Sequence, residues 1–179
     1  MFEKPFLTDV QNLRKRARRH IDESAVTADD RADRETVLNL LNDSLATEIV
    51  CVLRYRRYYF VAKGIHSMDI ADEFVAHSNE EQCHADQIAE RIVQLGGEPN
   101  FSPDGLLSRG HPEYGESNSL VELIKEDIVA ECIAMDGYRD IIQYLRHRDP
   151  TTRRMMEGIL AVEAKHAGEM ADLLEAMPA

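Results

Sequence analysis

The sequence has 179 residues, of which 44% are hydrophobic and 30% charged. This length suits one globular domain with a real core and is too short for two comfortable ones. A formal net charge of −12 disfavours non-specific nucleic-acid binding by the body of the protein. Three cysteines without a CxxC pair argue against a disulfide scaffold and a zinc ribbon, so a reducing compartment, the cytoplasm, is expected. No apolar run approaches the ~18–20 residues of a membrane span, so no membrane association is expected.

The first 32 residues are expected to form an N-terminal extension that is partly helical and differs in charge from the rest. A basic run at 14–19 precedes an acidic stretch at 29–33. The basic run could bind DNA, but a solvated face or a subunit contact is the commoner role of such a run.

Residues 33–179 are expected to form one helical bundle. Four long helices are predicted over about 33–63, 67–95, 119–146 and 150–176. Gly64 suits the end of the first helix. Ser119 and Glu122 form a capping-box pattern at the start of the third. Asp149 is the expected cap of the fourth, with Pro150 in the favoured first position.

Short turns join the first helix to the second and the third to the fourth, so each pair must be an antiparallel hairpin. The segment between the hairpins, about 96–118, has no helical period and is long for a loop in a compact domain. A helix of ~28 residues is ~42 Å long, and about 20 extended residues span that distance. The expected fold is therefore an all-α four-helix bundle in which one long crossover joins two hairpins.

Four glutamates and two histidines divide into two matching halves of the chain: Glu48, Glu81 and His84, then Glu131, Glu163 and His166. Glu48 lies 33 residues before Glu81, and Glu131 lies 32 before Glu163. Each half ends in Glu-x-x-His, which places a carboxylate and an imidazole on the same face of a helix. Four carboxylates and two imidazoles in this arrangement indicate a two-metal site.

These six residues fall in the middle of apolar seams whose steps alternate between three and four residues. An unpaired carboxylate there costs several kcal/mol, roughly, and four together would repel one another. Two divalent cations would cancel the four negative charges. The alternative is a bundle with surface acidic residues and no metal.

A tyrosine follows each lone glutamate by seven residues, Tyr55 after Glu48 and Tyr138 after Glu131. Either tyrosine could donate a hydrogen bond to a ligand carboxylate or supply an electron, and packing is the alternative for Tyr138. His77 lies one turn before Glu81 on the same seam. A hydrogen-bonded core histidine is favoured there over an additional iron ligand.

Five segments carry a resemblance to bacterioferritin, and together they cover about residues 36–176: 45–55, 79–86, 96–100, 127–131 and 159–166. The resemblance implies a ferritin-like four-helix bundle holding two iron ions per subunit, with manganese and zinc as alternatives. It implies that Glu81 and Glu163 bridge the metals and that Glu48 and Glu131 are terminal ligands. His84 and His166 then bind one metal each, and Tyr55 is the tyrosine beside the site.

The sequence differs from the bacterioferritin pattern in two features, and both favour a resemblance to a related group. Gln82 stands where that family has its haem methionine, which argues against haem. The sequence also lacks room for the short fifth helix of cages with twenty-four subunits and has the N-terminal extension instead. This combination resembles Dps-like miniferritins called thioferritins, whose cages have twelve subunits and which carry a cysteine pair near the metals. A homo-oligomer, preferably a dodecamer, is expected.

Cysteines follow three of the ligands closely: Cys51, Cys83 and Cys132. A redox role as in thioferritins is one interpretation, with Cys83 and Cys132 as the preferred pair if adjacent helices bring them within disulfide reach. Buried packing is the other.

The function implied is that of a ferroxidase: O₂ or H₂O₂ oxidises Fe²⁺, and Fe³⁺ is stored in a protein cage. Two alternatives remain open at this point. One is a di-iron or di-manganese peroxidase or catalase without a cage, and the other is a Dps-like protein that protects DNA.

Overall fold

The computed structural model describes residues 11, 33–64, 67–111, 114 and 116–177. Five helices lie in residues 33–177 of this set: α2 (Arg34–Gly64), α3 (Met68–Gln94), α4 (Leu106–Arg109), α5 (Leu120–Leu145) and α6 (Pro150–Ala176). The predicted all-α four-helix bundle is confirmed, and its four long helices match the expected ranges within one or two residues at most boundaries. The expected N-terminal extension, with its basic run, lies outside the described residues apart from residue 11.

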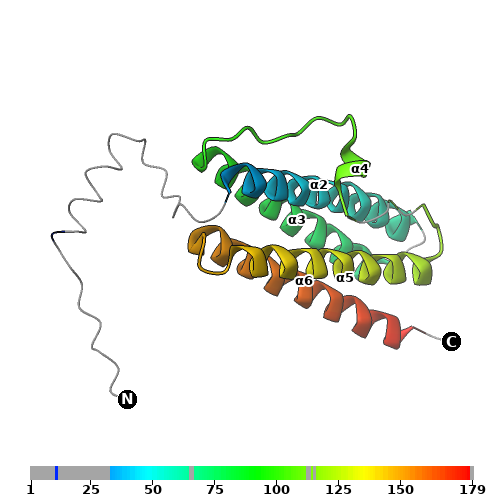
Figure 1. Cartoon of the computed structure of the whole chain (residues 1–179). Helices are drawn as coiled ribbons and strands as arrows, with labels where there is room; N and C mark the ends of the chain where they lie inside the picture. The colour runs from blue at the N-terminus through cyan, green and yellow to red at the C-terminus, as the bar shows by residue number, and fades with distance from the viewer. Residues whose placement is uncertain (1–10, 12–32, 65–66, 112–113, 115, 178–179) are drawn as a thin grey trace, which may run out of the picture.

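The long helices form two antiparallel hairpins, α2 with α3 and α5 with α6 (Figure 1). The chain then runs along the bundle, so that α5 begins at the end opposite to the one where α3 stops. This crossover includes α4, a short helix that was not expected in the loop and that packs against α2. The backbone N–H of His111 donates to Thr47 Oγ1 at 3.0 Å. The crossover is therefore attached to the outer side of α2 one residue from Glu48.

Two helix boundaries follow directly from local chemistry. At the end of α3, Gly96 has a φ of 72°, which glycine adopts without a steric penalty. Its N–H donates to the Val93 carbonyl at 2.8 Å, and the N–H of Gly97 donates to the Ile92 carbonyl at 2.9 Å, the bonds of a left-handed helix stop. At the start of α6, the Asp149 side chain accepts the backbone N–H of Thr152 at 2.9 Å, as expected of its cap.

Two other boundary predictions were wrong in detail. Gly64 is the last residue of α2, not the residue beyond it. Ser119 does occupy the cap position of α5, but its side chain makes no capping hydrogen bond. Glu122, the other half of the expected capping box, turns outward to Lys125 Nζ at 3.0 Å. An exposed ion pair one turn away thus competes successfully for this carboxylate.

The bundle interior holds two apolar clusters with a polar layer between them. One cluster includes Leu41, Ile88 and Met156, and the other includes Phe74 and Ile124. Both clusters contain fully buried tyrosines, and the predicted ligands lie at the level between the clusters. Burial of these apolar side chains, at about 25 cal/mol per Å², supplies the main stabilisation that allows charged groups inside.

A buried polar contact ties the end of α3 to the start of α6. Arg91 Nη2 lies 3.1 Å from Asp149 Oδ2, and Arg91 Nε donates to Thr152 Oγ1 at 2.7 Å. Burial raises the pKa of Asp149, but hydrogen bonds from Thr152 and Arg91 outweigh it and hold that pKa below its usual value. The two hairpins are thus joined at this end by a charged pair.

One of the described helices, α2, is long and apolar enough to cross a membrane by length and composition alone. The expectation that no such run exists was therefore wrong for this helix. Half of its most apolar stretch is buried inside the bundle, as in the core helix of a bundle protein.

Candidate metal centre

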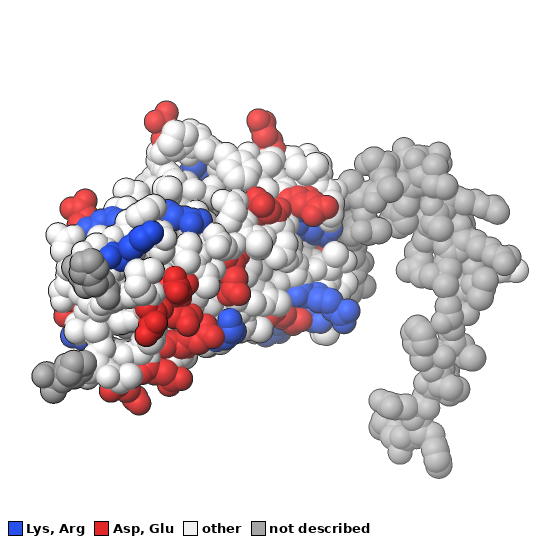
Figure 2. Space-filling model, turned by 180° about the vertical axis from the view of Figure 1, so that it is seen from behind, with Lys and Arg blue, Asp and Glu red and all other residues white. Residues whose placement is uncertain are grey.

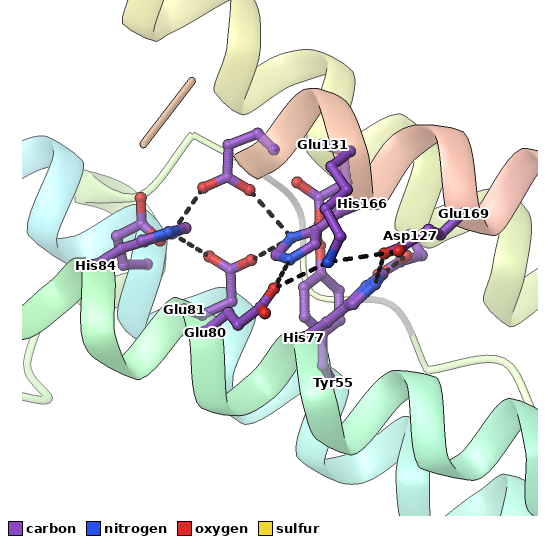
Figure 3. A network of polar contacts seen from close by, with 12 residues as sticks. Tyr55, His77, Glu80, Glu81, His84, Asp127, Glu131, His166 and Glu169 are labelled. Atoms are coloured by element: carbon purple, nitrogen blue, oxygen red, sulfur yellow. Dashed lines mark hydrogen bonds and ion pairs between the residues drawn. The ribbon is translucent and has the colours of Figure 1, made fainter. Parts of the chain in front are cut away.

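The structure brings all six predicted ligands together at mid-bundle, and each side chain is buried. They come from all four long helices: Glu48 from α2, Glu81 and His84 from α3, Glu131 from α5, and Glu163 and His166 from α6. Figure 3 shows Glu81, Glu131, His84 and His166 converging from the surrounding helices.

The six residues form two overlapping groups whose ligand atoms lie within 4.8 Å of one another. One group is Glu48, Glu81, His84 and Glu163, and the other is Glu81, Glu131, Glu163 and His166. Glu81 and Glu163 belong to both groups. Two metal ions held side by side in these groups would share two carboxylates.

In each group the histidine turns its Nδ1 atom to the carboxylates. His84 Nδ1 lies 2.9 Å from Glu163 Oε1 and 3.5 Å from Glu48 Oε2. His166 Nδ1 lies 3.2 Å from Glu81 Oε1 and 3.6 Å from Glu131 Oε1. The two imidazoles therefore face the shared carboxylates from opposite sides.

Five of the facing atoms are buried without a hydrogen-bond partner among the described residues: Glu48 Oε2, Glu81 Oε1, His84 Nδ1, Glu163 Oε1 and His166 Nδ1. A buried polar atom without a partner costs about 1–3 kcal/mol, so such a concentration needs an explanation. Carboxylate oxygens and imidazole nitrogens are donors that suit iron, manganese and zinc. The residues present therefore fit a pair of divalent metal ions.

Without metal, protons must balance the charge of the buried carboxylates. Burial, followed by repulsion from Glu81, raises the pKa of Glu48 well above its usual value. Burial likewise raises the pKa of Glu131. Burial opposes ionisation of His84, but the nearby Glu163, Glu48 and Glu81 carboxylates stabilise the charged imidazolium, outweigh burial and raise the pKa to about 12. The metal-free centre thus retains protons at the positions that cations would take.

The two predicted tyrosines hold the terminal glutamates from the opposite hairpin. Tyr55 of α2 donates its hydroxyl to Glu131 Oε1 at 2.8 Å, and Tyr138 of α5 donates to Glu48 Oε1. Both rings are fully buried. The hydrogen-bonding interpretation of both residues is confirmed, and each bond fixes one carboxylate across the bundle.

Two further acidic residues near the centre were missed. Glu80 Oε2 lies 2.5 Å from His166 Nε2, and a carboxylate on the far nitrogen fixes the orientation of a ligand histidine. Asp127 is fully buried, one turn before Glu131 on α5. The spacing of four residues from a ligand, within an apolar stretch, was the signal that could have found Asp127.

The expected pairing of Cys83 with Cys132 within one chain was wrong. A disulfide requires the two Cα atoms to lie within about 7 Å, whereas no Cα atom of α3 lies within 8 Å of one of α5. The two helices are diagonal neighbours in the bundle. Both cysteines are free and exposed, and Cys51 is free and buried.

A family model of the ferritin-like domain matches residues 38–179. The chain belongs to the ferritin-like family. This ferritin-like chain is 30% identical over 142 residues to the bacterioferritin of Mycobacterium avium, covering 79% of the chain and 85% of that protein. Its fold matches the dodecameric thioferritin of Bacteroides fragilis, a bacterioferritin-related protein, with a TM-score of 0.80 and 27% identity over 86% and 93% of the two chains.

The ferritin-like fold is also shared with the Desulfovibrio desulfuricans bacterioferritin, whose structure contains a di-iron site. The TM-score is 0.73, with 21% identity over 83% of this chain and 82% of that one. The predicted resemblance to bacterioferritin and thioferritin is therefore confirmed at the level of family and fold.

Proposed function

We propose that this ferritin-like chain is a ferroxidase that oxidises Fe²⁺ at the two-metal centre and stores Fe³⁺ in a protein cage. The observation that carries this proposal is the pair of four-residue groups sharing Glu81 and Glu163. Two Fe²⁺ ions held side by side can together give the two electrons that reduce O₂ and two protons to H₂O₂, or H₂O₂ and two protons to two water molecules. The similarity to bacterioferritins supports this assignment.

Each ligand has a distinct task in the proposed reaction. Glu81 and Glu163 would contact both ions, since each belongs to both groups. Glu48 and Glu131 would each hold one ion, and His84 and His166 would each give one imidazole nitrogen. Carboxylates suit the reaction because hard oxygen donors bind Fe³⁺ as well as Fe²⁺.

Tyr55 is the proposed catalytic residue beside the ligands. Its hydroxyl lies 2.8 Å from Glu131 Oε1, which places an oxidisable phenol within one residue of a metal position. Burial raises the pKa of this phenol well above its usual value, so the hydroxyl keeps its proton at neutral pH. Tyr55→Phe should slow Fe²⁺ oxidation, while the Fe²⁺ content after anaerobic loading stays equal to that of the wild-type protein.

The direct test loads metal-free protein with Fe²⁺ under anaerobic conditions and then adds O₂ or H₂O₂. We expect two Fe²⁺ per subunit bound at the centre, followed by oxidation that far exceeds the rate of Fe²⁺ alone. Comparing the two oxidants identifies the preferred one. Absence of Fe²⁺ uptake at neutral pH would contradict the proposal.

We propose in addition that the protein is cytoplasmic and that it assembles as a homo-oligomer, preferably a dodecamer. Large apolar side chains lie on the outside of the described subunit. Leu53 is 52% exposed and Phe60 is 62% exposed, and the two lie seven residues apart on the same face of α2. The similar thioferritin is dodecameric. Native mass spectrometry should give twelve subunits, whereas a dimer that turns over peroxide without forming mineral would favour the peroxidase or catalase alternative.

A further inference from the structure

A second group of potential ligands lies beside the dinuclear centre and is not used by it. Glu73 and His77 are one turn apart on α3, and Glu169 approaches from α6. One ligand atom from each lies within 4.8 Å of the others. Both glutamates are partly exposed, and Figure 2 shows acidic side chains gathered on the face of the molecule that it presents. A cation could therefore reach this group from solvent.

His77 has the environment of a metal ligand more than that of an ordinary core residue. Its ring is 1% exposed, with Nε2 at 3.3 Å from Glu169 Oε2. Its other nitrogen, Nδ1, has no hydrogen-bond partner among the described residues and faces Asp127 Oδ2 at 3.8 Å. Neither Asp127 oxygen has a partner within that part of the chain.

This arrangement matches a recurrent pattern in metal sites. A metal-bound histidine usually donates its second ring N–H to a carboxylate, which fixes its orientation and tautomer. A cation on His77 Nε2 would leave the proton on Nδ1, directed at the unpaired Asp127 carboxylate. The same pattern operates in reverse at His166, whose Nδ1 faces the dinuclear centre while Nε2 contacts Glu80.

The oxygen of Glu169 that does not face His77 is paired with a lysine. Lys165 Nζ lies 3.4 Å from Glu169 Oε1, which leaves Oε2 as the atom directed at His77 (Figure 3). The His77 and His166 rings stack with centroids 3.9 Å apart, and His77 also has a ring nitrogen within 4.8 Å of ligand atoms of Glu131 and His166. A cation in this group would therefore lie next to the dinuclear centre while using two glutamates that the centre does not use.

We propose that Glu73, His77 and Glu169 form a third divalent-cation site, distinct from the two-metal centre. It binds a first-row cation such as Fe²⁺ through His77 Nε2 and one oxygen from each glutamate. Nitrogen and carboxylate donors of this kind suit Fe²⁺, Co²⁺, Mn²⁺ and Zn²⁺. The site stands on its own geometry and requires no oxidation at the centre.

The test counts Co²⁺ ions bound to full-length, metal-free protein by calorimetric titration and by metal analysis after equilibrium dialysis. The wild-type protein should bind three Co²⁺ per subunit. The double variant Glu73→Gln, Glu169→Gln should bind two. The matched control Asp72→Asn, Glu175→Gln removes the same charge from exposed positions of the same two helices and should still bind three.

Two further variants keep the test decisive. The variant Glu81→Gln, Glu163→Gln should lose the two central ions and keep one, so failure of the dinuclear centre is distinguishable from failure of the third site. The single change Glu73→Gln should weaken one of the three equivalents at least tenfold, even if the double variant folds poorly. Binding of two Co²⁺ by the wild type, or equal loss in the matched control, would overturn the proposal.

Discussion

The His84 half and the His166 half of the proposed metal centre have the same types of candidate ligand but different surroundings. His166 is fully buried, contacts Glu80 through Nε2 and stacks on His77. His84 is 4% exposed, and the described residues offer it no carboxylate beyond the three ligands that it faces. The two halves of the chain therefore repeat the candidate ligands but not the residues that orient those ligands.

This difference should make the two metal positions unequal. An imidazole held by a second carboxylate loses less freedom on binding a cation and is a stronger donor. We therefore expect the His166 half to bind metal more tightly than the His84 half. The five predictions that follow test the proposed centre and this inequality, from the largest expected effect to the smallest.

Metal removal should have the largest effect, because it removes the cations that neutralise four buried carboxylates. At a free metal concentration of 100 times the dissociation constant, each site adds about 2.7 kcal/mol to the free energy of unfolding, so the two sites of the centre alone add about 5 kcal/mol. Thermal unfolding with and without Co²⁺ measures this. Two separate steps of stabilisation during titration would reveal unequal halves, and no shift in Tm would contradict metal binding.

The difference in Tm between metal-loaded and metal-free protein should depend on pH. Between pH 6.5 and 12 the folded metal-free protein keeps the proton of His84 while the unfolded chain releases it, because the pKa is raised from 6.5 to about 12. The stability that this proton provides is complete below pH 6.5 and is lost with rising pH, at about 1.4 kcal/mol per unit. Cations compete with this proton, so the gap in Tm between metal-loaded and metal-free protein should widen from pH 6.5 to 8.5.

Loss of a shared ligand should damage both halves, whereas loss of a terminal ligand should damage one. We expect Glu163→Gln to weaken both metal sites by more than about 100-fold, since even the loss of an outer-shell partner costs 10–100-fold. Glu48→Gln should weaken mainly the His84 half. Metal titrations of both variants measure this, and identical binding curves for the two would contradict the shared role of Glu163.

The carboxylate of Glu80, which contacts His166 from outside the centre, should affect the metal affinity of the His166 half alone. Glu80→Gln should lower the metal affinity of the His166 half by about 10–100-fold and leave the His84 half unchanged. Glu90→Gln, an exposed acidic position on the same helix, is the matched control. If Glu80→Gln weakens both halves equally, the asymmetry inferred from His166 is wrong.

The tyrosines should give the smallest effect, and the two should be similar. Tyr138→Phe and Tyr55→Phe each remove one buried hydrogen bond to a carboxyl group whose pKa is raised. Such a bond between neutral groups contributes about 1 kcal/mol. Denaturant unfolding of the metal-free variants measures this loss, and a difference of several kcal/mol between them would show that one hydroxyl has another partner.

The sequence predicts the hairpins and the convergence of the six candidate ligands well because both depend on periodicity along single helices. Glu81 and His84 must share a face whatever the bundle does around them. Which helices are neighbours depends on packing, and a four-helix bundle has diagonal pairs as well as adjacent ones. The Cys83–Cys132 pairing failed for this reason.

Contacts between the ends of side chains on different helices could not be predicted from the sequence either. Glu80 precedes a ligand and points to another helix, where its carboxylate reaches His166. Asp127 is an acidic residue on a helix with several exposed acidic positions, and only the packing shows that it is buried. Both cases depend on the rotation of one helix relative to another, which spacing along a chain does not specify.

The buried contact of Arg91 with Asp149 and Thr152 fixes the position along the bundle at which the carboxylates of Glu81 and Glu163 lie side by side. Glu81 lies ten residues before Arg91, and Glu163 lies eleven after Thr152, which correspond to about 15 and 17 Å along antiparallel helices. One fixed point near the end of the bundle thus aligns two residues of different hairpins. A slip of one helical turn there would separate them by about 5.4 Å, more than twice a metal–ligand bond of about 2.0–2.2 Å.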